Sequence, residues 1–226
     1  MFEAVVLLTE AAEQAALSQI LRSRRQDLTI RPVTGITELR SLDPSLLRHA
    51  RLIAFASSII VPGELLASLG YGAYNFHPGP PTYPGWAPTH FALYDRASEF
   101  GVTLHAMAER VDTGMILDVT SFPIPENAGV LGLCELTYAQ LLSLFVEWAD
   151  RLAHQPLLPA PRPEIQWSGR RNSRRNYKAI CDIPLDISKD ELWRRMRIFG
   201  ANHYGITPTL NLHGVTFAAR FPAEHA

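Results

Sequence analysis

The sequence predicts an α/β fold in which a doubly wound, mostly parallel sheet is followed by a small C-terminal α+β appendage. Three observations predict it. Short β-rich apolar runs alternate with helical patterns over residues 1–155, four prolines fall within residues 155–164, and a helix pattern and a hairpin pattern follow. We therefore expect one domain at 1–155 and a second at 156–226. A chain of 226 residues, 47% of them hydrophobic, is long enough to bury the core of such a fold.

The elements of the sheet follow from local patterns. A β-rich apolar run predicts the first strand at 2–8, and apolar residues at helical spacing predict a helix at 11–25. The same reasoning predicts further strands at 27–33, 51–56, 73–76, 101–108 and 115–122. It predicts helices at 44–49, 62–69, 89–96 and 137–154, of which the last is the most clearly amphipathic.

The appendage has signals of its own. Ser188 and Glu191 form a capping box before a helix that Gly200 can end. Residues 207–221 are typical of a hairpin that turns at His213 and Gly214. If this hairpin exposes a strand edge, we expect that it can pair with a second copy of the chain and form a homodimer.

Charge is distributed unevenly along the chain. The net charge of −1 gives no reason to expect disorder or nucleic-acid binding. Residues 1–150 contain 9 Lys and Arg against 16 Asp and Glu, whereas residues 151–226 contain 12 against 6. The basic part includes the run GRRNSRR at 169–175, which can bind a nucleotide or phosphate; a solvated face, or a contact with the protein's own acidic body, is the commoner explanation.

Cysteine usage and the N-terminus indicate the compartment. Cys134 and Cys181 lie far apart and form no Cys-x-x-Cys motif, which indicates neither a disulfide framework nor a zinc site and favours a reducing cytoplasm. The N-terminus lacks the basic start of a signal peptide. No apolar stretch approaches the roughly 18 residues of a membrane helix, so we expect a cytoplasmic protein without a membrane partner.

Several familiar motifs are missing. The turn LLTEAAEQ after the first strand contains no glycine, which argues against a dinucleotide cofactor. There is no Walker loop and no Gly-x-Ser-x-Gly elbow. A metal site is disfavoured and none is expected, because Asn75, His77 and Asp112 would leave a divalent ion short of protein ligands.

One constellation does indicate a catalytic site. Asn75 and His77 stand at the end of a strand and face the same side, since alternate residues of a strand share a face. A proline-rich loop follows, then Gly-Val-Thr-Leu-His at 101–105 and Val-Asp-Thr-Gly at 111–114. Each piece alone is more simply explained as a cap, a turn or a buried histidine. Their order and spacing together favour a site.

In these residues the chain resembles the folate-dependent formyltransferase family, which includes glycinamide ribonucleotide, methionyl-tRNA and sugar-nucleotide formyltransferases. The resemblance implies a Rossmann-like formyltransferase fold and a one-carbon transferase that uses 10-formyltetrahydrofolate as formyl donor. It implies Asn75, His77 and Asp112 as catalytic residues. Formyl transfer to an amine passes through a tetrahedral intermediate, whose oxygen an amide and an imidazole can stabilise. His77 and Asp112 would also handle the proton that the amine loses.

The resemblance also implies binding residues. By position, the pterin of the donor is expected against Ser57, Ser58, Ile59, Ile60, Val61, Glu109, Arg110 and Val111, although core packing explains the apolar ones about equally well. The amine acceptor is expected near Tyr83, Trp86, His90 and His105. For His105, a buried role with a backbone partner is at least as well supported as direct catalysis.

The expected acceptor is a small-molecule amine. The glycine-free first turn removes the cradle that would bind the phosphate of glycinamide ribonucleotide. The appendage is too short for the tRNA-binding barrel of methionyl-tRNA formyltransferases. An amino-sugar nucleotide or a specialised metabolite therefore comes first. Two alternatives stay open: a formyltetrahydrofolate hydrolase, although such enzymes usually carry an N-terminal regulatory domain not expected here, and a non-catalytic folate-binding protein of the same fold.

Overall fold

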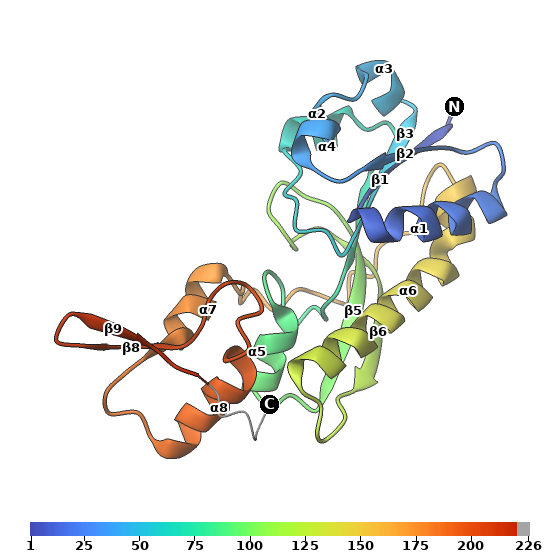
Figure 1. The fold of residues 1–226 in the computed structure, drawn as a ribbon. Helices are drawn as coiled ribbons and strands as arrows, with labels where there is room; N and C mark the ends of the chain where they lie inside the picture. Colours follow the sequence, from blue (N-terminus) through green and yellow to red (C-terminus); the bar gives the residue numbers. More distant parts are fainter. Residues whose placement is uncertain (221–226) are drawn as a thin grey trace.

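The computed structural model describes residues 1–220, in which a six-stranded sheet carries helices on both faces and a three-stranded sheet lies to one side (Figure 1). Phe221, at the end of the predicted hairpin segment, and the rest of the expected appendage to residue 226 lie outside the described residues.

The large sheet has six strands: β1 (Ala4–Leu8), β2 (Thr29–Val33), β3 (Ala50–Phe55), β4 (Ala73–His77), β5 (Glu99–Ala106) and β6 (Ile116–Pro123). Across the sheet their order is β2-β1-β3-β4-β5-β6. The first four in this order run parallel, whereas β4 pairs with β5, and β5 with β6, in antiparallel fashion. The predicted mostly parallel sheet is therefore confirmed.

The body of the chain has six helices: α1 (Ala11–Arg24), α2 (Ile36–Arg40), α3 (Pro44–Leu47), α4 (Gly63–Ser68), α5 (Pro88–Tyr94) and α6 (Val130–His154). Figure 1 shows α1 and α6 on one side of the strands and α2, α3 and α4 on the other. In β1, Val5 and Leu7 join the apolar cluster of the α1 and α6 side, whereas Val6 and Leu8 join the opposite cluster. Both faces of the sheet are thus buried, as is usual for parallel strands.

Two helices of the body differ from the prediction. α2 has no predicted counterpart, and α6 begins at Val130 rather than at 137 because Val130 and Leu133 continue its buried side. By length and composition α6 could cross a membrane, contrary to the expectation that no stretch approaches that size. Its residues Leu141, Phe145 and Trp148 are buried in the same apolar cluster as the sheet.

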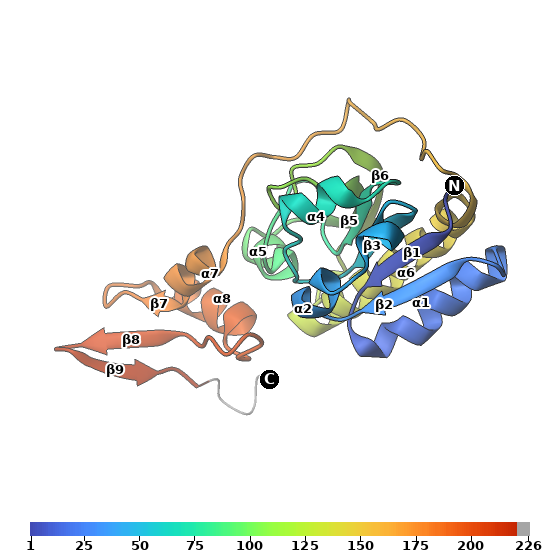
Figure 2. The same ribbon diagram turned by 90° about the horizontal axis from the view of Figure 1, so that it is seen from above.

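The appendage contains α7 (Arg174–Cys181), β7 (Asp182–Ile183), α8 (Lys189–Phe199) and the hairpin of β8 (Thr209–Leu212) and β9 (Val215–Ala218). The predicted capping box is confirmed, because the Ser188 side chain accepts the N–H of Glu191, and α8 ends at Gly200. The predicted hairpin turn is also confirmed: His213 and Gly214 both have positive φ, as two-residue hairpin turns require. The hairpin projects away from the rest of the chain (Figure 2).

The sequence patterns do not predict α7, because its first turn lies in the basic run expected at the surface. It is stabilised by packing: Tyr177 and Cys181 are buried in one apolar cluster with Phe91 of α5 and Phe199 of α8. This cluster joins the appendage to the body of the chain, and the division into two domains at residue 155 stays a prediction.

Candidate active site

The strand β4 places Asn75 and His77 beside a third polar residue. β4 pairs with β3 on one side and antiparallel with β5 on the other, and in that register Asn75 lies opposite His105. The Asn75 Nδ2 is 3.1 Å from the His105 Nε2. Because this proximity depends on the pairing of β4 with β5, residue spacing alone could not supply it.

Asp112 reaches the same cluster from the loop between β5 and β6. Its Oδ2 accepts the backbone N–H of Gly85 at 2.7 Å and lies 3.5 Å from His77 Nδ1. Its Oδ1 lies 3.4 Å from His105 Nε2. Asp112 has a φ of 49°, a left-handed conformation that costs free energy in a non-glycine residue. The contacts of the carboxylate with Gly85 and the two rings offset this strain.

Burial sets the charge states of the cluster. His77 and Asp112 are each 5% exposed. Burial lowers the pKa of His77 because it disfavours the imidazolium; Asp112 only partly offsets this effect, and His105 adds to it. Burial alone would raise the pKa of Asp112, but His105, His77 and the N–H of Gly85 favour the carboxylate and lower the pKa overall. At neutral pH the pair is therefore a neutral imidazole beside a carboxylate.

Two polar atoms of the cluster are left without a partner. Asn75 Oδ1 and His77 Nε2 are buried and find no hydrogen-bond partner in the described part of the chain. The ring of His105 is already engaged, because Nδ1 is 2.8 Å from Ala106 O, while Nε2 is 3.1 Å from Asn75 Nδ2 and 3.4 Å from Asp112 Oδ1. A Cβ at Gly79 would lie 2.7 Å from His77 Nε2, so glycine there leaves space beside this nitrogen. Unpartnered buried polar atoms are costly and indicate where a ligand can bind.

The chemistry open to this cluster is that of acyl transfer. The amide of Asn75 can donate to a carbonyl oxygen on which negative charge develops. The neutral imidazole of His77 can accept a proton, and the carboxylate of Asp112 stabilises the imidazolium that results. Within residues 1–220 no group of three or more His, Cys, Asp or Glu side chains is placed to hold a metal ion.

The cluster lies in a cavity of about 890 Å³ with two walls. We call one the β3 wall; it follows β3 and β5 and is lined by residues 56–61 with Met107, Ala108, Glu109 and Val111. We call the other the appendage wall; it is lined by residues 171–174 and Tyr204, together with residues 85–88. The cluster joins the two walls, because Asn75 pairs with Ala54 of β3 while Asp112 binds Gly85.

The β3 wall contains most of the residues predicted to bind the donor. Those that line the cavity are Ser57, Ser58, Ile59, Ile60, Val61, Glu109 and Val111. Arg110 does not line it and is exposed. Ile60 is 62% exposed, so this wall offers a large apolar side chain to a ligand.

The residues predicted to contact the acceptor separate into two groups. Trp86 and His105 line the cavity, whereas Tyr83 and His90 do not. Tyr83 packs on Phe100 with ring centroids 6.3 Å apart. His90 is 1% exposed and its Nε2 is 3.0 Å from His203 Nδ1. Both side chains point into packed regions, which a loop position in the sequence could not indicate.

Sequence reasoning missed Trp167, which lies just after the proline-rich stretch at 155–164. Its ring packs edge-on against His105 and His77, with centroids 5.0 and 5.8 Å apart, and its Nε1–H donates to Gly114 O at 2.8 Å. An isolated tryptophan between a proline-rich stretch and a basic run was the available signal. Sequence reasoning also missed the cavity-lining role of Asn172, Ser173 and Tyr204; the basic run at 169–175 was noted, but its commoner explanation was a solvated face.

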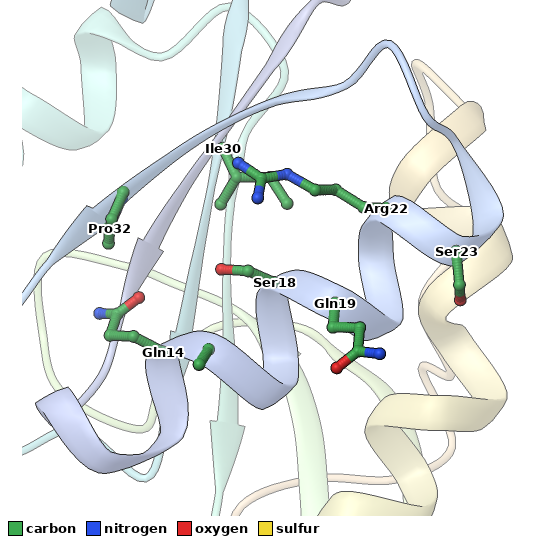
Figure 3. A pocket seen from close by; sticks show the side chains of 8 residues that line it. Gln14, Ser18, Gln19, Arg22, Ser23, Ile30 and Pro32 are labelled. Atoms are coloured by element: carbon green, nitrogen blue, oxygen red, sulfur yellow. The ribbon is translucent and has the colours of Figure 1, made fainter.

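A second hollow, of about 640 Å³, lies apart from this cluster. Figure 3 shows it between α1 and the edge strand β2, where Gln14, Ser18 and Arg22 lie beside Ile30 and Pro32. At its end the Gln14 side chain donates to the carbonyls of Leu7, Thr9 and Val33. It brings together no residue predicted for the site.

Residues 43–133 match the formyl transferase family model. The methionyl-tRNA formyltransferase of Geobacillus thermodenitrificans is 30% identical over 158 residues, which cover 66% of this chain and 48% of that protein. The chain thus spans less than half the length of the curated relatives it matches first.

Solved structures share the fold. A sugar N-formyltransferase from Shewanella aligns over 98% of both chains with a TM-score of 0.78 and 19% identity. An N-formyltransferase from Helicobacter canadensis, solved with folinic acid and dTDP-3-aminofucose, covers 95% of this chain and 85% of its own, with a TM-score of 0.67 and 16% identity. The segment 43–133, which carries Asn75, His77, His105 and Asp112, is therefore similar in sequence to the formyl transferase family, and the fold is that of the solved N-formyltransferases.

Proposed function

We propose that this protein is an N-formyltransferase that moves a formyl group from 10-formyltetrahydrofolate to the amine of a small molecule. The observation that carries the proposal is the pair of unpartnered buried atoms, Asn75 Oδ1 and His77 Nε2, in a cavity beside the Asp112 carboxylate. An amine can donate a hydrogen bond to the two unpartnered atoms, and a carbonyl oxygen can accept one from the Asn75 amide N–H.

The β3 wall fits a folate donor. Ile59, Ile60 and Val61 present apolar surface to the cavity, and the backbone groups of the two lining loops can bind the polar edge of a flat heterocycle. The exposure of Ile60 supports this assignment, because a ligand that covers a large exposed apolar side chain removes apolar surface from water, which is favourable. The bound folate would supply the formyl group at the Asn75 and His77 end of this wall.

The side chains of the cluster then have separate tasks. The Asn75 amide nitrogen lies 3.1 Å from His105 Nε2, and an N–H of this amide donates to the carbonyl oxygen as negative charge develops on it. His77 Nε2 accepts the proton that the attacking amine loses, as the new C–N bond forms. Asp112 stabilises the imidazolium, and the proton passes on to the nitrogen that the formyl group leaves.

An amino-sugar nucleotide is the acceptor that we propose first. The Helicobacter canadensis relative was solved with dTDP-3-aminofucose, which supports this class. The curated relatives are methionyl-tRNA formyltransferases, which makes an aminoacyl-tRNA the competing acceptor. The proposal also includes a cytoplasmic location, since Cys134 and Cys181 are both free thiols, as in a reducing compartment.

The test is an assay with 10-formyltetrahydrofolate and a panel of amines that includes nucleotide-linked amino sugars and methionyl-tRNA. We expect a formylated amine by mass spectrometry, and a fall in kcat of roughly 100- to 1,000-fold for His77→Gln. The exposed histidine variant His49→Gln serves as the matched control and should keep full activity.

Two outcomes would contradict the proposal. Stoichiometric release of formate with every amine absent would identify a hydrolase. Tight binding of a folate analogue with no formyl transfer or hydrolysis, unchanged in His77→Gln, would identify a non-catalytic folate-binding protein.

The proposal includes a homodimer formed through the hairpin. Val215 and Phe217 of β9 are 55% and 50% exposed, and β9 pairs only with β8 among the described strands. An exposed apolar edge is suited to pairing with a second copy. Light scattering should give twice the mass of the chain, and Phe217→Glu should give a monomer; a monomeric wild-type protein would refute this part.

A further inference from the structure

The appendage wall is built as a fixed part of the cavity rather than as a loose loop. Gly85 forms a bridge with Asn172, the N–H of Asn172 donates to Pro84 O at 2.9 Å, and the N–H of Trp86 donates to Asn172 O at 3.0 Å. Asn172 is 5% exposed. A Cβ at Gly85 would lie 2.2 Å from Asn172 O, so only glycine lets the two segments approach this closely. The backbone of this wall is therefore held in place.

This wall carries positive charge with no negative partner. Arg171 and Arg174 both line the cavity, and neither forms an ion pair with any residue in the range 1–220. Their neighbour Arg170 does pair, with Asp95 at 3.6 Å. The carboxylates that line the cavity are Glu109 on the opposite wall and Asp112, which is already engaged with Gly85. Two unpaired guanidinium groups at one edge of a cavity favour a ligand with phosphate there.

The same wall carries an aromatic surface. Trp86 and Tyr204 both line the cavity, with ring centroids 4.3 Å apart and an interplanar angle of 45°. Trp86 is supported from behind by Tyr177, at 5.1 Å between centroids, so its ring is held in place. Tyr204 remains 39% exposed. A supported, partly exposed aromatic pair can stack on a planar ring such as a nucleobase.

From this arrangement we propose that the appendage wall binds the nucleoside diphosphate part of the acceptor. Arg171 and Arg174 bind the diphosphate, and Trp86 with Tyr204 contacts the base. This inference rests on the proposed function, and it names the residues that bind the acceptor. The wall lies next to the proposed catalytic residues, because the Gly85 N–H donates to Asp112, which lies 3.5 Å from His77. An amino sugar attached to the bound diphosphate would thus enter between the wall and His77.

The test measures binding of dTDP, UDP, thymidine and inorganic pyrophosphate to the intact chain by titration calorimetry. The variants are Arg171→Gln, Arg174→Gln and Tyr204→Leu. The matched control is Arg175→Gln, which changes the same charge in the same run at an exposed residue that does not line the cavity. Binding of 5-formyltetrahydrofolate is measured on every variant, because the donor is assigned to the other wall.

We expect each cavity arginine variant to bind dTDP and UDP about 10-fold or more weakly, the effect typical of one lost charge-assisted hydrogen bond. Thymidine should bind these variants as it binds the wild type, and Tyr204→Leu should weaken thymidine and dTDP alike. Arg175→Gln should bind all ligands within about twofold of the wild type. The two arginine variants should keep their affinity for the folate.

The results that overturn the inference differ from those that overturn the proposed function. If the wild type binds the folate but neither dTDP nor UDP, or if Arg175→Gln loses as much affinity as Arg171→Gln and Arg174→Gln, the appendage wall is not the diphosphate site. If the wild type binds the nucleoside diphosphates but no folate, the proposed function fails. The assignment of the appendage wall is then still supported, because it depends only on nucleotide binding.

Discussion

Two buried histidines of this protein, His77 and His90, show how surroundings decide what an imidazole can do. Both keep a ring nitrogen without a hydrogen-bond partner, and burial lowers the pKa of both. His77 lies in a cavity 3.5 Å from the Asp112 carboxylate. His90 lies among aromatic rings, with His203 as its polar neighbour and no carboxylate of residues 1–220 in contact. A neutral imidazole can serve as a base only where a substrate can reach it and a carboxylate can stabilise its charge.

The same comparison separates two regions. The cluster around His77 contains buried polar atoms that lack hydrogen-bond partners in the described residues. This is unfavourable for stability but suits ligand binding. The interface around His90 joins α5 to α7 and α8, and there Glu191 is tied to Tyr94, Arg194 and Arg195. Changes in the first region should therefore affect rate, and changes in the second should affect stability.

The largest effect is expected for Asn75→Ala. This variant removes the amide N–H that faces the reacting carbonyl, and loss of one such donor lowers kcat by roughly 100- to 1,000-fold. The exposed Asn127→Ala is a matched control that should leave kcat unchanged. Steady-state kinetics with the identified acceptor check it; a fall in kcat of less than about threefold would remove Asn75 from the chemistry.

The next effect is on stability, at His90. Burial, reinforced by the charge of His203, lowers the pKa of His90 from 6.5 to about 4. Because the unfolded chain binds this proton more readily, stability is complete above about pH 6.5 and is lost as the pH falls towards 4. The loss should be on the order of 3 kcal/mol, at about 1.36 kcal/mol per pKa unit.

Chemical denaturation between pH 7 and 4 measures this loss, with His90→Phe as the comparison. The phenylalanine ring cannot titrate, so the slope of the unfolding free energy against pH should become smaller over this range. An identical slope in both proteins would show that His90 is not the group responsible.

These two residues also illustrate what the sequence could and could not predict. The strand pattern and the Asn-x-His spacing are local, so they predicted the fold class and drew attention to Asn75 and His77. His77 and His90 lie near each other in the sequence. However, His77 is at the end of β4, whereas His90 is on the buried side of α5. Which side chain faces a cavity depends on what packs on it, and here that is α7 and α8, far away in the chain.

The appendage wall was harder to predict for a related reason. A proline-rich connector shows stiffness in its sequence but not its path, and it is long-range contacts such as the bridge between Gly85 and Asn172 that bring residues 171–174 to the cavity. The placement of Trp167 on both histidines has the same origin. The glycine-free first turn, in contrast, is a local feature, and there the Gln14 side chain occupies three backbone carbonyls.

A smaller effect is expected for Trp167, which packs on two histidines of the first region, His77 and His105. Each edge-on aromatic contact is worth roughly 0.5–1.5 kcal/mol, so loss of the ring should loosen His77 and His105 and lower kcat by about 10-fold in Trp167→Ala. Trp167→Phe keeps a ring and should recover most of the rate. Affinity for a folate analogue, measured alongside, should stay the same in both variants; a parallel loss of folate affinity would indicate general disruption instead.

The smallest expected effect is a shift in the pH dependence of kcat/KM, and it distinguishes the two histidines directly. The proposed base must be neutral, so the rate should fall as the pH drops through the pKa of His77, which burial holds below 6.5. The Asp112 carboxylate raises that pKa, so in Asp112→Asn the residual activity should fall at still lower pH. In His90→Phe the acidic limb should stay where it is in the wild type, since that ring is outside the cavity. One acceptor is used throughout, so that its own ionisation is common to all three proteins. An acidic limb that moved with His90 but not with Asp112 would mean that activity is lost through unfolding of the α5 interface, and the assignment of His77 as the base would then be wrong.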